Sequence, residues 1–142
     1  MAADSPGSSH RLGTIAVTAG RPERVPDAPL NPPITMAATY VAGGEVEYGR
    51  YGNPTWTALE DALGALEGGR CLTFASGLAA VATVLDLVGA DGTVVVPRHG
   101  YTGTIMQLAD LEARGRLKAH LVDITDTDAV VAACADASLV WL

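Results

Sequence analysis

Residues 74–97 read FASGLAAVATVLDLVGADGTVVVP and combine one predicted helix with one predicted strand. The first part, from Gly77 to about Val88, is apolar and long enough for a helix that packs on a core. The second part, Thr93–Val96, is a run of β-branched residues that Pro97 ends. Three successive valines leave this strand no polar face, which is typical of a parallel sheet covered on both sides.

The flanking sequence repeats the alternation of helix and strand. Asn53 and Pro54 predict the N-cap and first turn of an earlier helix, and Gly68-Gly69 predicts its end. Further strands are predicted at 71–74, 117–122 and 138–142, and further helices at about 105–115 and 126–135. The predicted fold class is therefore α/β with a mostly parallel sheet.

Residues 1–54 have a different composition. Seven of the eight prolines lie here, and apolar periodicity is limited to a short amphipathic turn at about 12–17. Proline fixes φ and removes backbone donors, so this segment is predicted to be an extended arm that needs another surface to lie on. We expect two parts, the arm at 1–54 and an α/β domain at 55–142. A sheet that ends on the apolar run 138–142 also predicts that the chain is the N-terminal part of something larger.

Composition restricts the functional class. The chain has 142 residues, a formal net charge of −7 and 49% apolar residues, which excludes intrinsic disorder and argues against nucleic acid or an anionic membrane as a partner. The N-terminus has no apolar stretch of the kind found in signal peptides, and two cysteines are too few for a disulfide framework. We therefore expect a cytoplasmic protein. The spacing of the histidines and cysteines predicts no metal site.

Three segments carry groups suited to binding or catalysis. Ser76-Gly77-Leu78 lies between a strand and a helix, where backbone amides can hold a phosphate, although a plain turn with a serine N-cap explains the residues as well. Tyr48 and Arg50 lie in a loop that contains two glycines. They can be interpreted as ligands of a phosphate, or as a tyrosine that packs on the protein and an arginine that is solvated. Tyr101 follows the valine strand, where ligands of parallel sheets bind, and the neighbouring His99 is interpreted as exposed.

Taken together, these segments resemble the Cys/Met-metabolism family of pyridoxal 5′-phosphate (PLP) enzymes. That family includes cystathionine γ-synthase, cystathionine γ-lyase, methionine γ-lyase and the homoserine-ester sulfhydrylases. Residues 48–55 are similar to its Tyr-Ser-Arg-x-Gly-Asn-Pro-Thr signature, 76–78 to its Ser-Gly-Met turn and 101–104 to its Tyr-Gly-Gly-Thr segment. Pro32-Pro33-Ile34 and Ala38-Thr39-Tyr40 are similar to its Pro-Ile and Ser-Thr-Phe stretch.

The resemblance implies a fold-type-I PLP-dependent transferase, seen as the N-terminal arm and the first part of the cofactor-binding domain. Tyr48 and Arg50 would bind the cofactor phosphate of a neighbouring subunit in a homo-oligomer, by the family's pattern a tetramer. The amides of Gly77 and Leu78, with the hydroxyl of Ser76, would bind the phosphate within the same subunit.

The resemblance also implies roles near the reacting atoms. Tyr101 would stack on the pyridine ring and act as a proton acceptor. Glu47 resembles an acidic residue of cystathionine-handling members, so Glu47 and Tyr48 are expected to contact substrate. Gly103 stands where methionine γ-lyases typically carry cysteine.

The chain departs from the family pattern at three motif positions and lacks one required group. Gly49 replaces serine, Leu78 replaces methionine and Thr102 replaces the first glycine after the tyrosine. Pyridoxal chemistry needs a Schiff-base lysine and a carboxylate against the pyridine nitrogen. Lys118, the one lysine of the sequence, matches no family lysine, so residues 1–142 alone are not expected to complete the reaction.

The resemblance therefore predicts a PLP-dependent lyase or transferase of the transsulfuration type. The expected reaction is γ-elimination or γ-replacement on sulfur amino acids or homoserine esters, closest to cystathionine γ-synthase or γ-lyase. A methionine γ-lyase or an O-acylhomoserine sulfhydrylase is an alternative. Two other classes stay open: an inactive fragment or pseudoenzyme that serves as a binding or assembly module, and an unrelated nucleotide-binding α/β domain, which the missing glycine fingerprint disfavours.

Overall fold

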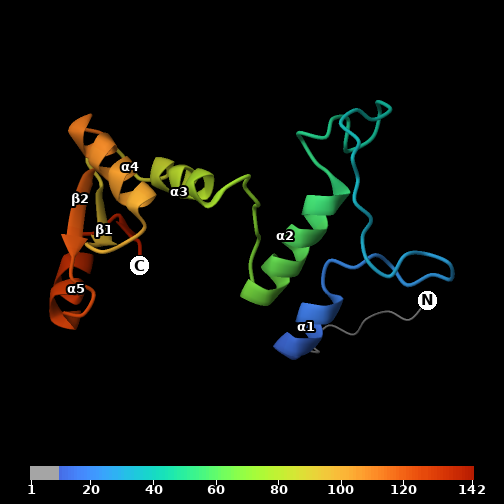
Figure 1. The fold of residues 1–142 in the computed structure, drawn as a ribbon, viewed down its shortest axis with the longest axis horizontal. Helices are drawn as coiled ribbons and strands as arrows, with labels where there is room; N and C mark the ends of the chain where they lie inside the picture. The colour runs from blue at the N-terminus through green and yellow to red at the C-terminus, as the bar shows by residue number, and fades with distance from the viewer. Residues whose placement is uncertain (1–9) are drawn as a thin grey trace. The chain divides into compact units, whose positions relative to one another are not determined.

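The computed structural model describes residues 10–142, which divide into two compact units (Figure 1). The first unit ends at Thr73 and the second is Phe74–Leu142. Residues 1–9 of the predicted arm lie outside the described residues. Each unit is described below by itself.

The first unit contains two helices joined by a long extended segment. Helix α1, Leu12–Thr18, confirms the predicted amphipathic turn, and α2 is Pro54–Glu67. Between these helices the chain forms no further helix and one isolated antiparallel bridge, Thr39 with Tyr48. The bridge pairs the two edges of a loop whose tip, residues 41–45, is exposed. The arm thus has little regular structure, as its prolines predict.

The start of α2 ties this arm down. Asn53 is the N-cap, and its Oδ1 accepts a hydrogen bond from the Thr55 amide at 2.8 Å. Its Nδ2 donates to the carbonyl oxygen of Thr35 at 3.0 Å, while the Thr35 amide donates to Oγ1 of Thr55 at 2.8 Å. The helix ends at Gly68, whose φ of 71° is the left-handed C-cap that glycine favours. Both predicted ends of this helix are confirmed.

The hydrogen bonds among Asn53, Thr55 and Thr35 give a first testable prediction. Asn53 is buried, and Asn53→Ala removes the N-cap acceptor and leaves the half-buried Thr35 carbonyl without its donor, so we expect a loss of about 1–3 kcal/mol in the free energy of unfolding. Urea unfolding of the full-length protein measures it. Asn31→Ala, an exposed asparagine of the same arm, is the control and should leave stability unchanged. Equal stability of the two variants would contradict the role given to Asn53.

The second unit is a three-stranded parallel sheet with helices packed on it. Its strands are β1, Thr93–Pro97; β2, Lys118–Val122; and β3, Leu139–Val140, in the spatial order β2-β1-β3. Both pairings are parallel, with Val94 opposite Ala119 on one side and Leu139 on the other. The helices are α3, Gly77–Asp86; α4, Thr102–Ala113; and α5, Thr127–Cys134. The predicted parallel α/β arrangement is confirmed.

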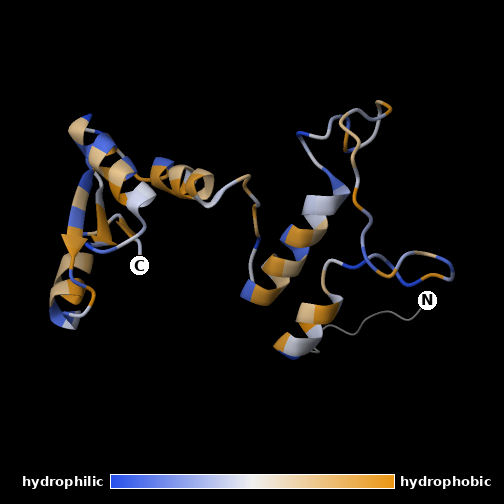
Figure 2. Cartoon of the chain, viewed as in Figure 1, coloured by the Kyte–Doolittle hydropathy of each residue, from blue (hydrophilic) through white to orange (hydrophobic). Residues whose placement is uncertain are grey.

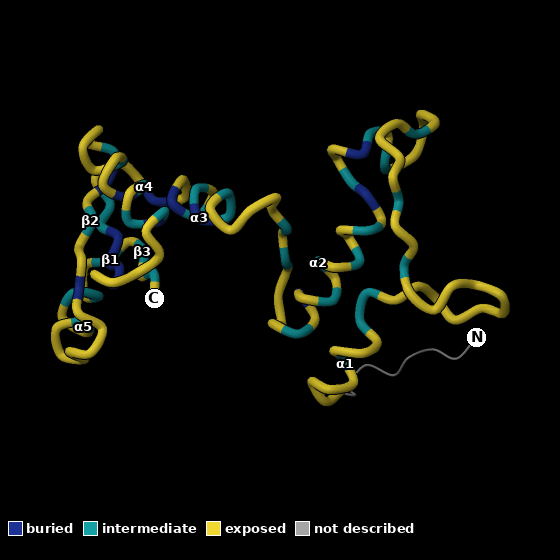
Figure 3. The backbone as a smooth tube through the Cα atoms, viewed as in Figure 1, coloured by how far each residue is buried: buried dark blue, intermediate teal, exposed yellow. Residues whose placement is uncertain are grey.

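The core of this unit forms around the central strand. Val94, Val95 and Val96 of β1 are at most 1% exposed, as the run of valines predicts (Figure 3). One cluster joins Val94 and Val96 to apolar side chains of α3 and α4 and of the following turns, which are Val81, Leu85, Val88, Leu108 and Leu117. In Figure 2 the ribbon of β1 is strongly hydrophobic. The strand is thus held at the centre of this unit.

Two predicted strands differ from the structure. Residues 71–74 form no strand; the Thr73 amide and hydroxyl both donate to one oxygen of Glu60, at 2.8 and 2.9 Å, which replaces a neighbouring strand. The predicted core strand at 138–142 is two residues long, and Val140 and Leu142 are 39% and 79% exposed. Within residues 10–142, β3 pairs with β1 and has no second neighbour, so its other side is open in the part of the protein described.

Candidate functional site

The N-terminus of α3 presents unpaired backbone donors. Ser76 is the N-cap, with φ −156°, and its Oγ accepts a hydrogen bond from the Ala79 amide at 3.2 Å. Across residues 10–142, the amides of Gly77 and Leu78 find no acceptor. Space for a Cβ at Gly77 is open, so an anion can approach the backbone there. The sequence left two alternatives for this turn, a serine N-cap and a phosphate-binding turn. Both can hold at once, because the Ser76 cap uses the Ala79 amide and leaves the amides of Gly77 and Leu78 open.

Tyr101 stands at the N-terminus of the neighbouring helix. It occupies the N-cap position of α4, makes no side-chain cap bond and is 68% exposed. Its ring lies over Gly103: a Cβ built on Gly103 would be 2.6 Å from Cε1 of Tyr101. The position of Tyr101 after the central strand matches the sequence prediction, and its aromatic face is accessible to a flat ligand.

One open hollow joins the first turns of α3 and α4. Ser76 and Leu78 line it on one side and Gly103 on the other, together with Ala79, Ala82, Met106 and Gln107. Oε1 of Gln107 is buried without a hydrogen-bond partner among the described residues. Thus the structure brings the predicted phosphate turn and the Tyr101 segment to one place. Sequence reasoning missed Gln107, although its spacing of four from Gly103 on a helix would have placed it on the same face.

The other predicted phosphate ligands lie in the first unit. The guanidinium carbon of Arg50 is 4.8 Å from the centroid of the Tyr48 ring, within reach of a cation–π interaction. The rings of Tyr48 and Tyr51 meet edge to face, with centroids 6.1 Å apart. Arg50 is exposed, and no carboxylate of residues 10–142 forms a salt bridge with it. Its charge is available to an anion.

Gly49 between these residues is required by close packing. Its amide donates to the Ala38 carbonyl oxygen at 2.7 Å. A Cβ on Gly49 would lie 3.0 Å from the Ala37 carbonyl oxygen and 3.1 Å from Cα of Ala38. The glycine that departs from the family's serine therefore lets two arm segments approach closely, and the backbone of the Tyr48–Arg50 turn keeps its support.

Glu47 and His99 are exposed. Oε1 of Glu47 accepts a hydrogen bond from the Gly43 amide at 3.4 Å, within its own loop, and its contact with substrate stays a prediction. His99 follows β1 in an exposed loop, as expected.

Two hydrogen bonds from Thr125, one from the hydroxyl and one from the amide, hold the pKa of Asp123 below its ordinary value, and the charges of Arg98 and His99 add to this.

Lys118 lies at the edge of the sheet away from Tyr101. It is the first residue of β2 and pairs with Thr93, the first residue of β1. The Tyr101 loop follows the opposite end of β1, about 13 Å along a strand of this length. Lys118 is therefore far from the Tyr101 segment in this unit, which agrees with its match to no family lysine.

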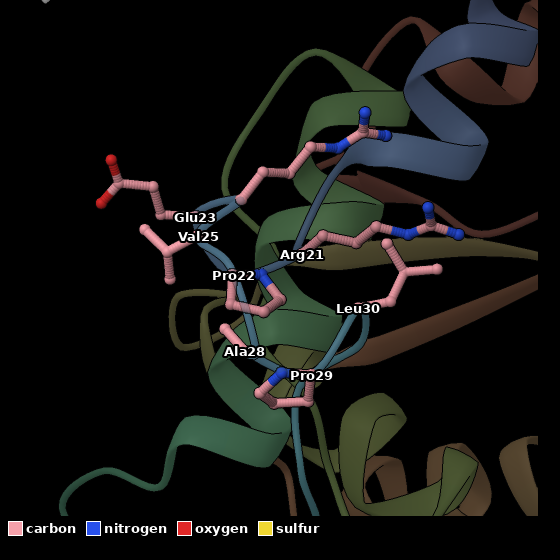
Figure 4. A pocket seen from close by; sticks show the side chains of 8 residues that line it. Arg21, Pro22, Glu23, Val25, Ala28, Pro29 and Leu30 are labelled. Carbon is pink, nitrogen blue, oxygen red and sulfur yellow. The ribbon is translucent and has the colours of Figure 1, made fainter.

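A separate hollow lies within the arm (Figure 4). It is lined by residues of a single loop and contains none of the predicted site residues: Arg21, Pro22, Glu23, Arg24, Val25, Ala28, Pro29 and Leu30. The Glu23 side chain points away from that of Arg21. Throughout residues 10–142 there is no trio of histidine, cysteine or carboxylate side chains arranged to hold a metal ion. In the same range no helix has the length and apolarity needed to span a membrane.

Comparison with known proteins decides the family. The model of the Cys/Met metabolism PLP-dependent enzymes matches residues 13–142. The chain belongs to this family. Human cystathionine γ-lyase is 34% identical over 139 residues, which cover 92% of this chain and 34% of the human enzyme. The family use of PLP, which the motifs implied, is thereby confirmed, and an unrelated nucleotide-binding domain is excluded.

Solved structures of this family share the fold. A cystathionine γ-lyase from Micromonospora echinospora superposes with a TM-score of 0.80 at 35% identity, covering 94% of this chain and 37% of that one. A cystathionine γ-synthase from Xanthomonas oryzae pv. oryzae, solved with aminoacrylate and cysteine, gives a TM-score of 0.80 at 28% identity over 94% and 36%. The chain spans about a third of the length of these relatives. The predicted α/β fold class of PLP-dependent enzymes is confirmed.

The second unit fits part of the PLP cofactor. The open amides of Gly77 and Leu78 suit a phosphate group, and the exposed Tyr101 ring suits a planar heterocycle. Gln107 lines the hollow beside Leu78 and Gly103, and its Oε1 is buried without a partner among the described residues. The described residues thus suit phosphate and ring contacts, and Lys118, the one lysine of the sequence, lies at the opposite end of the strands from Tyr101.

Proposed function

We propose that the protein catalyses PLP-dependent γ-elimination or γ-replacement on a sulfur amino acid or a homoserine ester, in the manner of a cystathionine γ-lyase or γ-synthase. One observation carries the proposal: Ser76 and Leu78, on either side of Gly77 and its open amide, share a hollow with Gly103, against which the Tyr101 ring lies, within a chain matched by the family model. Bound PLP supplies an electron sink that stabilises negative charge on the substrate's α-carbon.

The residues of this chain hold and orient the reactants. Ser76, Gly77 and Leu78 would bind the PLP phosphate at the positive end of α3. Tyr101 would stack on the pyridine ring of bound PLP, and its phenolic oxygen, in the deprotonated form, would take a proton from the substrate's ammonium group, giving the neutral phenol and the free amine. Glu47 and Tyr48 contact the substrate.

A second copy of the chain completes the site in this proposal. Tyr48 and Arg50 bind the phosphate held by α3 of a neighbouring subunit, in a homotetramer located in the cytoplasm. The exposed guanidinium of Arg50, held over the Tyr48 ring and free of any carboxylate among residues 10–142, supports such a contact. Charge-assisted contacts to phosphate are among the strongest that arginine makes.

A substrate panel tests the proposed reaction. The full-length protein, loaded with PLP, is incubated with cystathionine, with an O-acylhomoserine plus cysteine, and with methionine, and keto acid, thiol and cystathionine are quantified. We expect turnover with cystathionine or the homoserine ester, and its loss in Gly77→Asp, whose carboxylate repels the phosphate while suiting a helix N-terminus. Turnover of methionine alone would favour a methionine γ-lyase, and a loaded protein inert toward the whole panel would contradict the proposal.

A further inference from the structure

Gly103 leaves room that the Tyr101 ring occupies. A Cβ on Gly103 would be 2.6 Å from Cε1, 3.0 Å from Cζ and 3.2 Å from the hydroxyl oxygen of Tyr101. Real Cβ atoms essentially never come within 3.0 Å of another heavy atom in this way. The ring therefore lies against the first turn of α4 at a place that any side chain at position 103 would take.

The need for glycine here is spatial. Gly103 is the second residue of α4 and has no left-handed φ, so the backbone at this position suits any residue. Alanine is in fact the better helix former. A side chain at position 103 would thus leave the helix intact and act on what lies over it.

The Tyr101 ring is also free to move. The Tyr101 side chain is 68% exposed and makes no hydrogen bond as the N-cap of α4. The atoms that a Cβ on Gly103 would contact, Cε1, Cζ and the hydroxyl oxygen, are at the far end of this side chain. Tyr101 lines a hollow together with Pro97, Gly100, Thr104 and Trp141 among others. A displaced ring has room to turn about its side-chain bonds without unfolding α4.

We propose that Gly103 is a positioning residue that fixes where the Tyr101 ring lies. Gly103 itself lines the hollow between α3 and α4, and the ring that it positions lines a second hollow with Pro97 and Trp141. The part of this inference that concerns the cofactor rests on the proposed function; the placement of the ring does not.

Fluorine NMR of the full-length protein carrying 3-fluorotyrosine tests the placement directly. Tyr101→Phe identifies the Tyr101 resonance by its disappearance. We expect Gly103→Ala to shift that resonance, to keep or raise the melting temperature, and to raise the dissociation constant for PLP about two- to ten-fold, the range of one stacking contact. Gly13→Ala is the matched control: Gly13 is the second residue of α1, and a Cβ there meets nothing within 4 Å.

The outcomes separate this inference from the proposed function. A Tyr101 resonance unchanged in Gly103→Ala would overturn the inference, whatever the protein binds. A shifted resonance in Gly103→Ala, with none in Gly13→Ala, supports it. If the resonance shifts while PLP affinity stays constant, Gly103 positions the ring, and it is the stacking role given to Tyr101 in the proposed function that fails.

Discussion

We expect Tyr101→Phe to lower turnover of the PLP-loaded protein about 100-fold, the loss typical of removing a positioned acid or base. The substitution keeps the aromatic face, so PLP affinity and the melting temperature should change little. Tyr101 is 68% exposed and makes no side-chain bond at the cap of α4, so its hydroxyl contributes nothing to stability that the variant would lose. Steady-state kinetics and PLP titration of the same preparations measure both quantities.

Two further variants show which part of Tyr101 matters. Tyr101→Ala should lower turnover as well and weaken PLP binding by about 0.5–1.5 kcal/mol through lost stacking. Tyr40→Phe is the control, because the Tyr40 hydroxyl is buried without a partner among residues 10–142 and lies in the arm. Full turnover in Tyr101→Phe would remove the proton-transfer role, and unchanged PLP affinity in Tyr101→Ala would remove the stacking role.

The second large effect is expected at Arg50. Arg50→Ala removes a charge-assisted phosphate contact of about 1.5–3 kcal/mol, so PLP affinity should fall about ten- to a hundred-fold. Arg50 is exposed and held over the Tyr48 ring at 4.8 Å, so its loss should affect the fold little. Arg24→Ala, an exposed arginine of the same arm, is the control and should bind PLP as the unaltered protein does.

Mixed oligomers test whether Arg50 acts across subunits. Co-expression of differently tagged Arg50→Ala and Gly77→Asp chains, followed by purification through both tags, gives subunits with complementary defects. One site of each mixed pair then combines an intact α3 turn with an intact Arg50, and PLP binding should return there. Folded mixed oligomers without any recovered site would show that Arg50 and Gly77 serve one phosphate within a single chain.

Local signals of the sequence predicted most elements. Asn53-Pro54 and Gly68 marked both ends of α2 because caps depend on residues adjacent in the chain. The three valines of β1 predicted the buried centre of a parallel sheet, since no polar residue interrupts them. The Ser76 cap likewise followed from a short motif, whereas α4 begins at Thr102, about three residues before the predicted start, so that Tyr101 is its N-cap.

The failures lie where partners distant in sequence decide the outcome. Residues 71–74 look like a strand, yet the groups that satisfy Thr73 come from Glu60 in α2, which no pattern around Thr73 reveals. Similarly, the apolar composition of 138–142 does not tell which of its residues pair with β1. In the candidate site, the sequence shows Gly49 only as a departure from the family motif and Gly103 only as a position that differs between family members. Their packing roles depend on the atoms that a Cβ would contact, which only the structure shows.

The most direct test of the central claim is to locate the lysine that carries PLP. The full-length protein is loaded with PLP, reduced with borohydride and digested, and the labelled peptide is identified by mass spectrometry. Because Lys118 begins β2 at the edge of the sheet away from Tyr101, the account predicts a label on a lysine other than Lys118, and its loss in Gly77→Asp. A label on Lys118, or a protein that retains no PLP, would contradict it.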